Sequence, residues 1–404
     1  MTDVFIYDAV RTPRGKGREG GALNGLTPLD LQKTLIRALL ERTGLDAGRI
    51  DDLILGCVTQ VGEQGGNIAK VAALYAGLPA SVSGITVNRY CSSGLDACNF
   101  AAMKIATGMD EVVLAGGVEC MSRVPMLSDK ATFYSDPAVA QKTRFVPMGL
   151  AADLVGSLDG ISREECDAYA VMSQQRAARA QSEGRFARSL VAVADPASGA
   201  TVGQDECVRP GVTTEKLASF EPLFTEFGEK GYAAAFKAAF PELGELHYLH
   251  HAGNSPAVVD GASLVALGSR AAGEAAGLKP RARIRAMANV SSNELLALTG
   301  GIDVVAAVLA KAGMEHGDVD LVEFNEAFGA VSVKFVRDMP WDAERINPNG
   351  GAIALGHAMG ATGASLVGTV LDELERQDLG VGLVAVSGAA GIGTGLILER
   401  MSAS

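Results

Sequence analysis

The sequence lacks the cysteine patterns of a disulfide-rich protein or a zinc ribbon. Its six cysteines include no C-x-x-C pair, so we expect neither a disulfide framework nor a structural zinc site. It also has no G-x-x-x-x-G-K-[ST] loop, and we expect no metal. The N-terminal residues lack the positive and apolar blocks of a secretory signal. Together these absences favour a reducing, cytoplasmic setting.

Charged residues are scarce, and positive ones are the rarer kind. Only 20% of the 404 residues are charged and 48% are hydrophobic, which indicates a globular chain with a large buried core. The net charge of −12 argues against a general nucleic-acid binder, because neutralising phosphates needs clustered Lys and Arg. A local basic pocket for a phosphorylated ligand remains compatible with this total.

Residues 379–398 carry no charge, which meets the length criterion for a membrane span. Their glycines and β-branched residues instead favour one or two central strands joined by a tight turn and buried on both faces, as parallel strands are. We therefore expect no membrane span.

Two residues suited to acyl transfer occupy matching places in a repeated pattern. Cys91 and His357 each precede a glycine-containing turn, a helix-like segment and a strand-like segment. These segments are 95–106 with 111–117, and 364–374 with 382–388. A second matched pair of helix and strand signals covers 31–56 and 304–324. The duplication predicts a nucleophile and its base facing each other across a pseudo-twofold axis.

The residue types favour covalent chemistry over simple packing. A cysteine at the start of a helix has its thiolate stabilised by the helix dipole, so we expect a lowered pKa for the Cys91 thiol. The alternative is an inert buried cysteine. Asn325 follows a predicted strand where a polar side chain would emerge at a crevice. There it could hold a water or an oxyanion, or simply cap a helix.

The chain divides into three segments by composition. Residues 1–120 alternate strand and helix signals, and we expect this half to be completed by about 250–270; residues 271–404 form the second α/β half. Such alternation predicts helices packed on sheets. Residues 121–250 form an inserted loop domain, with an amphipathic helix expected at 161–188. It could carry substrate specificity or be a structural excursion or an oligomer contact.

An ordered set of motifs along nearly the whole chain resembles the thiolases, which cleave 3-oxoacyl-CoA with free CoA or run the reverse condensation. The motifs are Ala9-Val10-Arg11-Thr12-Pro13, Val87-Asn88-Arg89-Tyr90-Cys91-Ser92-Ser93-Gly94, Gly116-Gly117-Val118-Glu119-Cys120-Met121-Ser122, Ile161-Ser162-Arg163-Glu164-Glu165, Ala252-Gly253-Asn254, Asn325-Glu326-Ala327-Phe328, Asn349-Gly350-Gly351 and Gly356-His357. The resemblance implies the five-layered αβαβα thiolase fold, with two duplicated halves and an inserted loop domain. It also implies a homodimer or homotetramer acting in fatty acid β-oxidation or related lipid degradation.

The same resemblance implies roles for individual residues. Cys91 would take the acyl group as a thioester, and His357 would deprotonate Cys91 or CoA. With a water held by Asn325, His357 would form one oxyanion hole; the backbone N–H groups of Cys91 and the Ser387 region would form the other. Coenzyme A would be a co-substrate, with no permanently bound cofactor. The residues expected near its pantetheine arm are Met148, Gly253, Asn254 and Ser255.

The clearest departure from the family pattern lies near the C-terminus. Thiolases generally carry a second cysteine in a C-x-G loop, but no cysteine follows Cys207, and our alignment of this loop puts Ala385 at that position. One reading is a thiolase in which His357, a water or the pair His250-His251 transfers the proton. The others are a 3-oxoacyl-CoA hydrolase or specialised acyltransferase, and a catalytically idle CoA-binding protein.

Overall fold

A ten-stranded mixed sheet runs through the computed structural model, which describes residues 2–195 and 198–401. In sheet order its strands are β10 (Leu321–Phe324), β11 (Val381–Ser387), β12 (Ile392–Arg400), β9 (Ala282–Ser291), β1 (Val4–Arg11), β8 (Val259–Ser269), β5 (Val112–Cys120), β3 (Asp52–Gly56) and β4 (Ser83–Val87), and β2 (Gly15–Lys16) pairs with β8. β1 and β9 pair at the middle, so the sheet has a first and a second half.

The duplication predicted from the sequence is present in the topology. In the first half, α1 (Pro28–Thr43) precedes β3 and α3 (Ser93–Ala106) precedes β5, and β3 and β5 are parallel. In the second half, α12 (Gly300–Ala312) precedes β10 and α15 (Met359–Gln377) precedes β11, and β10 and β11 are parallel. Residues 379–398 form β11 and β12 as expected, but the two strands are antiparallel, joined by a short turn.

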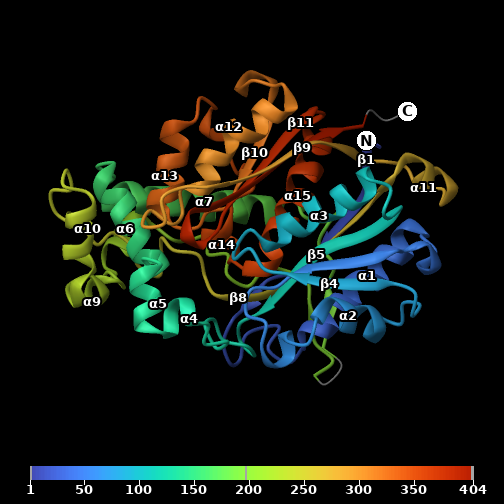
Figure 1. The fold of residues 1–404 in the computed structure, drawn as a ribbon, viewed down its shortest axis with the longest axis horizontal. Coiled ribbons are helices and arrows are strands. Elements are labelled where there is room, and N and C mark those ends of the chain that lie inside the picture. The colour runs from blue at the N-terminus through green and yellow to red at the C-terminus, as the bar shows by residue number, and fades with distance from the viewer. Residues whose placement is uncertain (1, 196–197, 402–404) are drawn as a thin grey trace.

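Three hydrophobic clusters separate the helices and sheet halves into five layers. One lies between the first sheet half and α1 with α2 (Ile68–Ala76). The second joins both sheet halves to α3 and α15, which pack against each other in the middle (Figure 1). The third covers the outer face of the second half beneath α12 and α13 (Gly329–Asp338). This order is the expected αβαβα arrangement.

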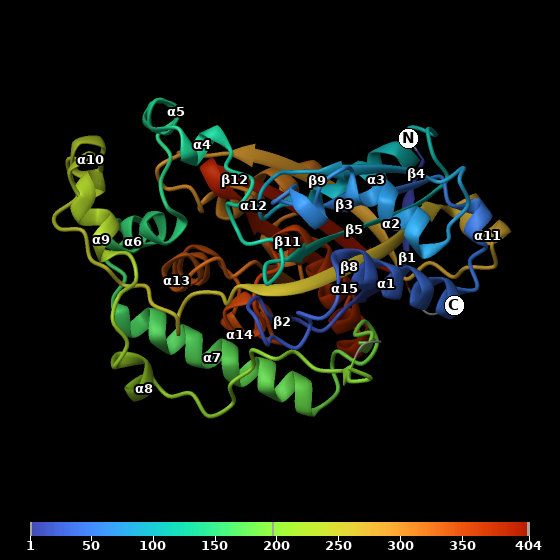
Figure 2. The same cartoon turned by 90° about the horizontal axis from the view of Figure 1, so that it is seen from below.

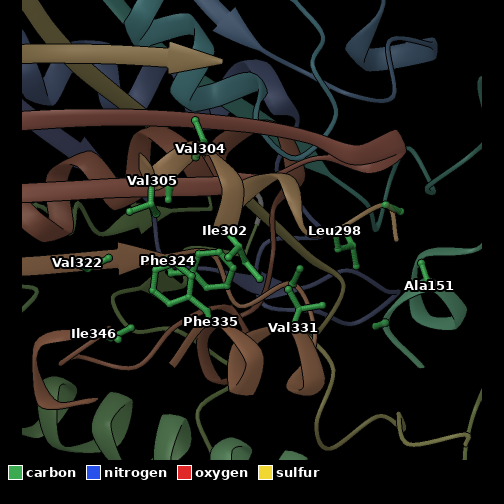
Figure 3. Close-up of a cluster of buried hydrophobic side chains, with 14 of the residues drawn as sticks. Ala151, Leu298, Ile302, Val304, Val305, Val322, Phe324, Val331, Phe335 and Ile346 are labelled. Atoms are coloured by element: carbon green, nitrogen blue, oxygen red, sulfur yellow. The ribbon is translucent and has the colours of Figure 1, made fainter. Parts of the chain in front are cut away.

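The third cluster fixes the end of β10. Phe324 on β10 stacks on Phe335 of α13 with ring centroids 4.0 Å apart, and aliphatic side chains of α12 pack around them (Figure 3). Because this packing holds the last residue of β10, it also holds Asn325, the first residue beyond the strand.

A long excursion separates β5 from β8, which pair with each other in the sheet. It contains α4 (Thr132–Ser135), α5 (Pro137–Lys142), α6 (Met148–Leu158), α7 (Arg163–Ser182), β6 (Val193–Ala194), β7 (Thr201–Val202), α8 (Thr214–Ala218), α9 (Thr225–Phe227) and α10 (Ala233–Ala239). In both views α6, α9 and α10 lie at the end of the molecule opposite α11 (Arg270–Ala275) (Figures 1 and 2). The helix expected at 161–188 is α7. No helix within the described ranges is long and apolar enough to cross a membrane.

Candidate active site

Glycines let the first turns of α3 and α15 touch. A methyl group added at Gly94 on α3 would lie 2.6 Å from the Gly360 carbonyl oxygen on α15, and one added at Gly56 would lie 2.7 Å from the same oxygen. Any larger side chain would force the helices apart. Cys91 precedes α3 and His357 precedes α15. The close packing therefore brings the two equivalent turns of the duplicated halves together.

Cys91 lies in a partly buried turn just before the Ser92 N-cap of α3. Burial, with a further contribution from the negative Glu119, raises the pKa of the Cys91 thiol to about 12. The prediction that the helix dipole lowers this pKa is wrong, because desolvation of the thiolate outweighs the dipole here. The resting residue is thus a neutral thiol that needs a base.

His357 is buried just before α15 and carries a defined proton. Its Nδ1 lies 2.8 Å from Thr362 Oγ1, and Thr362 donates its own hydroxyl hydrogen to the Ala358 carbonyl oxygen. The hydroxyl oxygen is therefore the acceptor, which assigns the proton of His357 to Nδ1. The Nε2 atom is buried and has no hydrogen-bond partner among the described residues.

The charge state of His357 follows from its surroundings. Burial, and after it the positive charge of Arg14, lowers the pKa of the His357 imidazole to about 3. The ring is therefore neutral at physiological pH, and its Nε2 atom has a free lone pair. A neutral imidazole with one fixed proton and one bare nitrogen is the form that a general base requires.

Asn325 directly follows β10 and is 1% exposed. Both polar atoms of its side chain, Oδ1 and Nδ2, are buried without a hydrogen-bond partner in the described part of the chain. The alternative role of helix cap does not apply, since the N-cap of α13 is Phe328. Buried polar groups are nearly always bonded, so this amide is suited to hold a water or a substrate oxygen.

The end of β11 lies against the Cys91 turn. Ser92 Oγ donates a hydrogen bond of 3.1 Å to the Val386 carbonyl oxygen, and a methyl group added at Gly388 would lie 3.1 Å from the Arg89 carbonyl oxygen. The backbone that follows Ser387 and the backbone of Cys91 are therefore neighbours, as two donors to one oxyanion must be.

Ala385 lies deeper than its predicted role requires. It is inside β11, opposite Phe324 and Gly395 in the register, and its side chain is fully buried in the cluster beneath α12. Ser387 is the residue that ends the strand, and its hydroxyl bonds the Leu298 carbonyl oxygen and the Gly301 N–H. The placement gives no support to Ala385 as the position of a missing crevice cysteine.

The segment expected beside pantetheine, residues 253–257, connects the start of α13 to the turn that holds His357. The Asn254 carbonyl oxygen accepts from Gly329 N at the start of α13, and the Ala257 carbonyl oxygen accepts from His357 N. Gly253, Ser255 and Ala257 of this segment line a small cavity of about 20 Å³.

The expected residues of this segment differ in their contacts. The Ser255 hydroxyl is buried without a partner among the described residues. Asn254 is held by bonds to Asp167 Oδ1 and the Leu249 carbonyl oxygen. Met148 begins α6 and packs against the cluster that contains Phe324 and Phe335. Ser255 therefore has a hydroxyl free to bind a ligand, whereas Asn254 supports the fold.

The pair His250-His251 has no free ring nitrogen. His250 bonds Asp153 Oδ1 through Nδ1 and accepts from Ala330 N through Nε2. His251 bonds Asp167 Oδ1 through Nε2 and accepts from Gly253 N through Nδ1. Both residues are fully buried. The proton relay suggested from the sequence is therefore not supported, because each ring already uses both nitrogens in the fold.

Two supporting residues were not assigned a role from the sequence. Thr362 lies five residues after His357 in the same glycine-rich motif. This short separation was the signal that could have identified it as a partner of His357. Glu119, part of the Gly116–Ser122 motif, accepts hydrogen bonds from Val58 N, Thr59 N, Gln64 Nε2 and Gly360 N. It ties the first turn of α15 to the loop after β3.

Two family profiles match almost the whole chain. The family profile "Thiolase, N-terminal domain" matches residues 4–271, and "Thiolase, C-terminal domain" matches residues 278–400. The chain is 40% identical to the "Beta-ketoadipyl-CoA thiolase" of Escherichia coli over 423 aligned residues, covering 99% of this chain and 100% of that protein. It is 38% identical to a "3-ketoacyl-CoA thiolase" of Aeromonas hydrophila over 408 aligned residues, again covering 99% and 100%.

Proposed function

The chain belongs to the thiolase family of acyltransferases, and we propose that Cys91, His357 and Asn325 carry its CoA-dependent cleavage of a 3-oxoacyl-CoA. The observation that carries this proposal is the buried Nε2 of a neutral His357, which has no partner among the described residues. His357 lies just before the first turn of α15, which packs on the first turn of α3 after Cys91. In this arrangement Cys91 supplies the nucleophile and His357 the uncharged base.

The first half-reaction transfers the acyl group to the enzyme. The Cys91 thiol gives its proton to His357 Nε2, and the thiolate sulfur attacks the 3-oxo carbon of the substrate. The C2–C3 bond then breaks, which leaves the acyl group on Cys91 as a thioester and releases acetyl-CoA as its enolate. Because the thiol pKa is raised and the imidazole pKa is lowered, this transfer needs the substrate's developing negative charge to be stabilised.

That stabilisation comes from fixed donors. The Asn325 amide, directly or through a water, supports the thioester oxygen of the enolate, and the N–H groups of Cys91 and of the turn after Ser387 support the oxyanion on the acyl carbon. A donor of this kind contributes on the order of 3 kcal/mol to transition-state stabilisation.

The proton needed by the enolate is already in the site. The His357 imidazolium formed in the first step returns its proton to C2, giving acetyl-CoA, and no second cysteine is required. In the second half-reaction a CoA thiol loses its proton to His357 Nε2 and attacks the Cys91 thioester. The products are the shortened acyl-CoA and Cys91, which regains the proton.

The substrate is a 3-oxoacyl-CoA; one relative is named for β-ketoadipyl-CoA and another for 3-ketoacyl-CoA. We propose that coenzyme A approaches along Met148, Gly253, Asn254 and Ser255, with the free Ser255 hydroxyl as a contact to its pantetheine amides. Coenzyme A is a co-substrate, and we propose no resident cofactor. All six cysteines are free, in keeping with a reducing, cytoplasmic setting.

A homodimer or homotetramer is proposed from the edge of the sheet. β4 is an edge strand, and Ile85 on it is 48% exposed beside exposed Val71, Leu74 and Tyr75 of α2. An unpaired edge with a surrounding apolar surface is a template for pairing with a second chain.

The division of the chain at 120, 250 and 271 stays a prediction.

The experiment follows acetoacetyl-CoA, a longer 3-oxoacyl-CoA and 3-oxoadipyl-CoA, each with and without free CoA, with products identified by mass. Conversion to acetyl-CoA and a shortened acyl-CoA only when CoA is present supports the proposal, and the relative rates rank the substrates. Loss of substrate without CoA would indicate a hydrolase. No loss of any substrate, with CoA still bound, would indicate an idle CoA-binding protein.

A further inference from the structure

Glu119, near the end of β5, is a fully buried carboxylate that accepts four hydrogen bonds from uncharged groups. One oxygen, Oε2, accepts from Val58 N and Gly360 N, both at 3.0 Å. The other, Oε1, accepts from Thr59 N at 3.1 Å and Gln64 Nε2 at 2.7 Å. Burial raises the pKa of the Glu119 carboxyl, and these four bonds oppose that rise. Since all four partners are donors, they fit an ionised carboxylate.

The bond to Gly360 caps α15. The N-cap residue of this helix, Ala358, has no side chain that can accept a hydrogen bond, and the first N–H groups of a helix have no partner within the helix. Glu119 supplies an acceptor from a strand 241 positions earlier in the sequence, and an acidic group stabilises a helix N-terminus. His357 directly precedes Ala358. The capped amide therefore lies in the turn that follows the proposed base.

The Gly360 peptide is also enclosed on its other sides. A methyl group added at Gly117 on β5 would lie 1.9 Å from the Gly360 carbonyl oxygen. One added at Gly360 itself would lie 2.6 Å from the Gly56 carbonyl oxygen and 2.8 Å from the Val118 carbonyl oxygen. The first turn of α15 therefore has little room to shift while its amide is bonded to Glu119.

The same carboxylate holds the loop after β3, which supports the segment leading to Cys91. In this loop the Val58 carbonyl oxygen accepts from Asn88 Nδ2 at 3.1 Å, and Cys57 N donates to the Val87 carbonyl oxygen at 3.1 Å. Val87 ends β4, and Cys91 lies four residues beyond it. The carboxylate thus connects the turn after the base to the backbone that carries the nucleophile.

We propose that Glu119 is a positioning residue for the thiolase reaction, which holds His357 at the distance from Cys91 that proton and acyl transfer require. This proposal rests on the proposed function. Glu119 acts through the Gly360 amide and exchanges no proton or bond with the substrate, so the reaction steps are unchanged. A shift of about 1 Å between reacting groups lowers a rate about 100-fold, so a fixed turn at this point affects the chemical steps directly.

The binding of CoA should depend little on Glu119. The segment expected beside pantetheine, residues 253–257, bonds the start of α13 and His357 N, and none of the four bonds to Glu119 involves it. Loss of Glu119 should therefore lower kcat and leave KM nearly unchanged. A residue that only stabilises the fold would change the folded fraction but not the rate of the folded enzyme.

The test compares Glu119→Ala and Glu119→Gln with the control Gln32→Leu. Alanine removes all four bonds, and glutamine offers one acceptor oxygen in place of two. Gln32 is fully buried and bonds the Gly117 carbonyl oxygen at 2.8 Å, so its replacement removes a buried bond to β5 but none to α15. Each protein is measured for urea unfolding, for kcat and KM of thiolysis, and for the single-turnover rate of Cys91 acylation by acid quench and peptide mass.

In folded protein, Glu119→Ala should lower kcat and the acylation rate about 100-fold and Glu119→Gln at least about fivefold, with KM within about threefold of the parent. Gln32→Leu should retain the parent rates. Parent rates in Glu119→Ala would overturn the proposal, as would parent rates in Glu119→Gln if the alanine variant does not fold. An equal fall in Gln32→Leu would also overturn it. No Cys91 adduct in the parent would instead refute the proposed function.

Discussion

Replacing Thr362 with valine removes the group that fixes the proton of His357. Valine has nearly the same shape but accepts no hydrogen bond, and the position is 1% exposed, so water cannot easily take its place. The Nδ1–H group would be left without the 2.8 Å contact that it has now. A buried donor without a partner costs about 1–3 kcal/mol. The ring can avoid this cost by moving its proton to Nε2, which removes the lone pair that the reaction needs.

Either response weakens catalysis by about the same amount, and we expect kcat/KM for thiolysis to fall about 5- to 150-fold. The assay follows the loss of a 3-oxoacyl-CoA with excess CoA. Thr362→Ser keeps the acceptor and should retain most of the activity. Thr369→Val is the matched control, because Thr369 lies two turns further along α15 and bonds only the Ser365 carbonyl oxygen. Equal activity in Thr362→Val and Thr369→Val would refute the assignment of the His357 tautomer.

Three further predictions concern single residues. Asn325→Ala should lower kcat about 100- to 1000-fold without loss of thermal stability, because both polar atoms that it removes are buried and unbonded; a large fall in the unfolding temperature would count against a catalytic role. The pKa of His357 is lowered to about 3 in the folded protein. As the pH falls below the ordinary histidine pKa, the unfolded chain therefore binds one more proton than the folded chain. The free energy of unfolding decreases in that range. Urea unfolding should show that His357→Asn loses about 2 kcal/mol less stability than the parent between about pH 7 and pH 5, and parallel losses would contradict this. Ile85→Lys on the β4 edge should yield a smaller species in size-exclusion chromatography with light scattering, and an unchanged mass would exclude this edge from the interface.

Pattern alone predicted the duplicated halves, and it put Cys91 and His357 at the starts of equivalent helices, where α3 and α15 begin. That they act as nucleophile and base stays a prediction. The pattern also predicted that Asn325 emerges just beyond a strand, because β10 ends where its apolar residues end. Such features depend on hydrophobic periodicity and glycine placement, which can be recognised from residues close together in the sequence.

Charge states could not be read in the same way, because they depend on burial and on residues distant in sequence. The helix dipole suggested a reactive thiolate at Cys91, yet desolvation and Glu119 act the other way. The adjacent histidines 250 and 251 looked available until their partners Asp153 and Asp167, about ninety positions earlier, were placed beside them.

The most direct test of the account is to capture the covalent intermediate on Cys91. The protein is mixed with a 3-oxoacyl-CoA in the absence of CoA, quenched in acid, and digested for peptide mass analysis, and a second sample receives CoA before the quench. The account predicts the shortened acyl group on the Cys91 peptide, one acetyl-CoA released for each adduct, and loss of the adduct as acyl-CoA when CoA is added. Turnover with no adduct on Cys91, or an adduct that CoA does not remove, would contradict it.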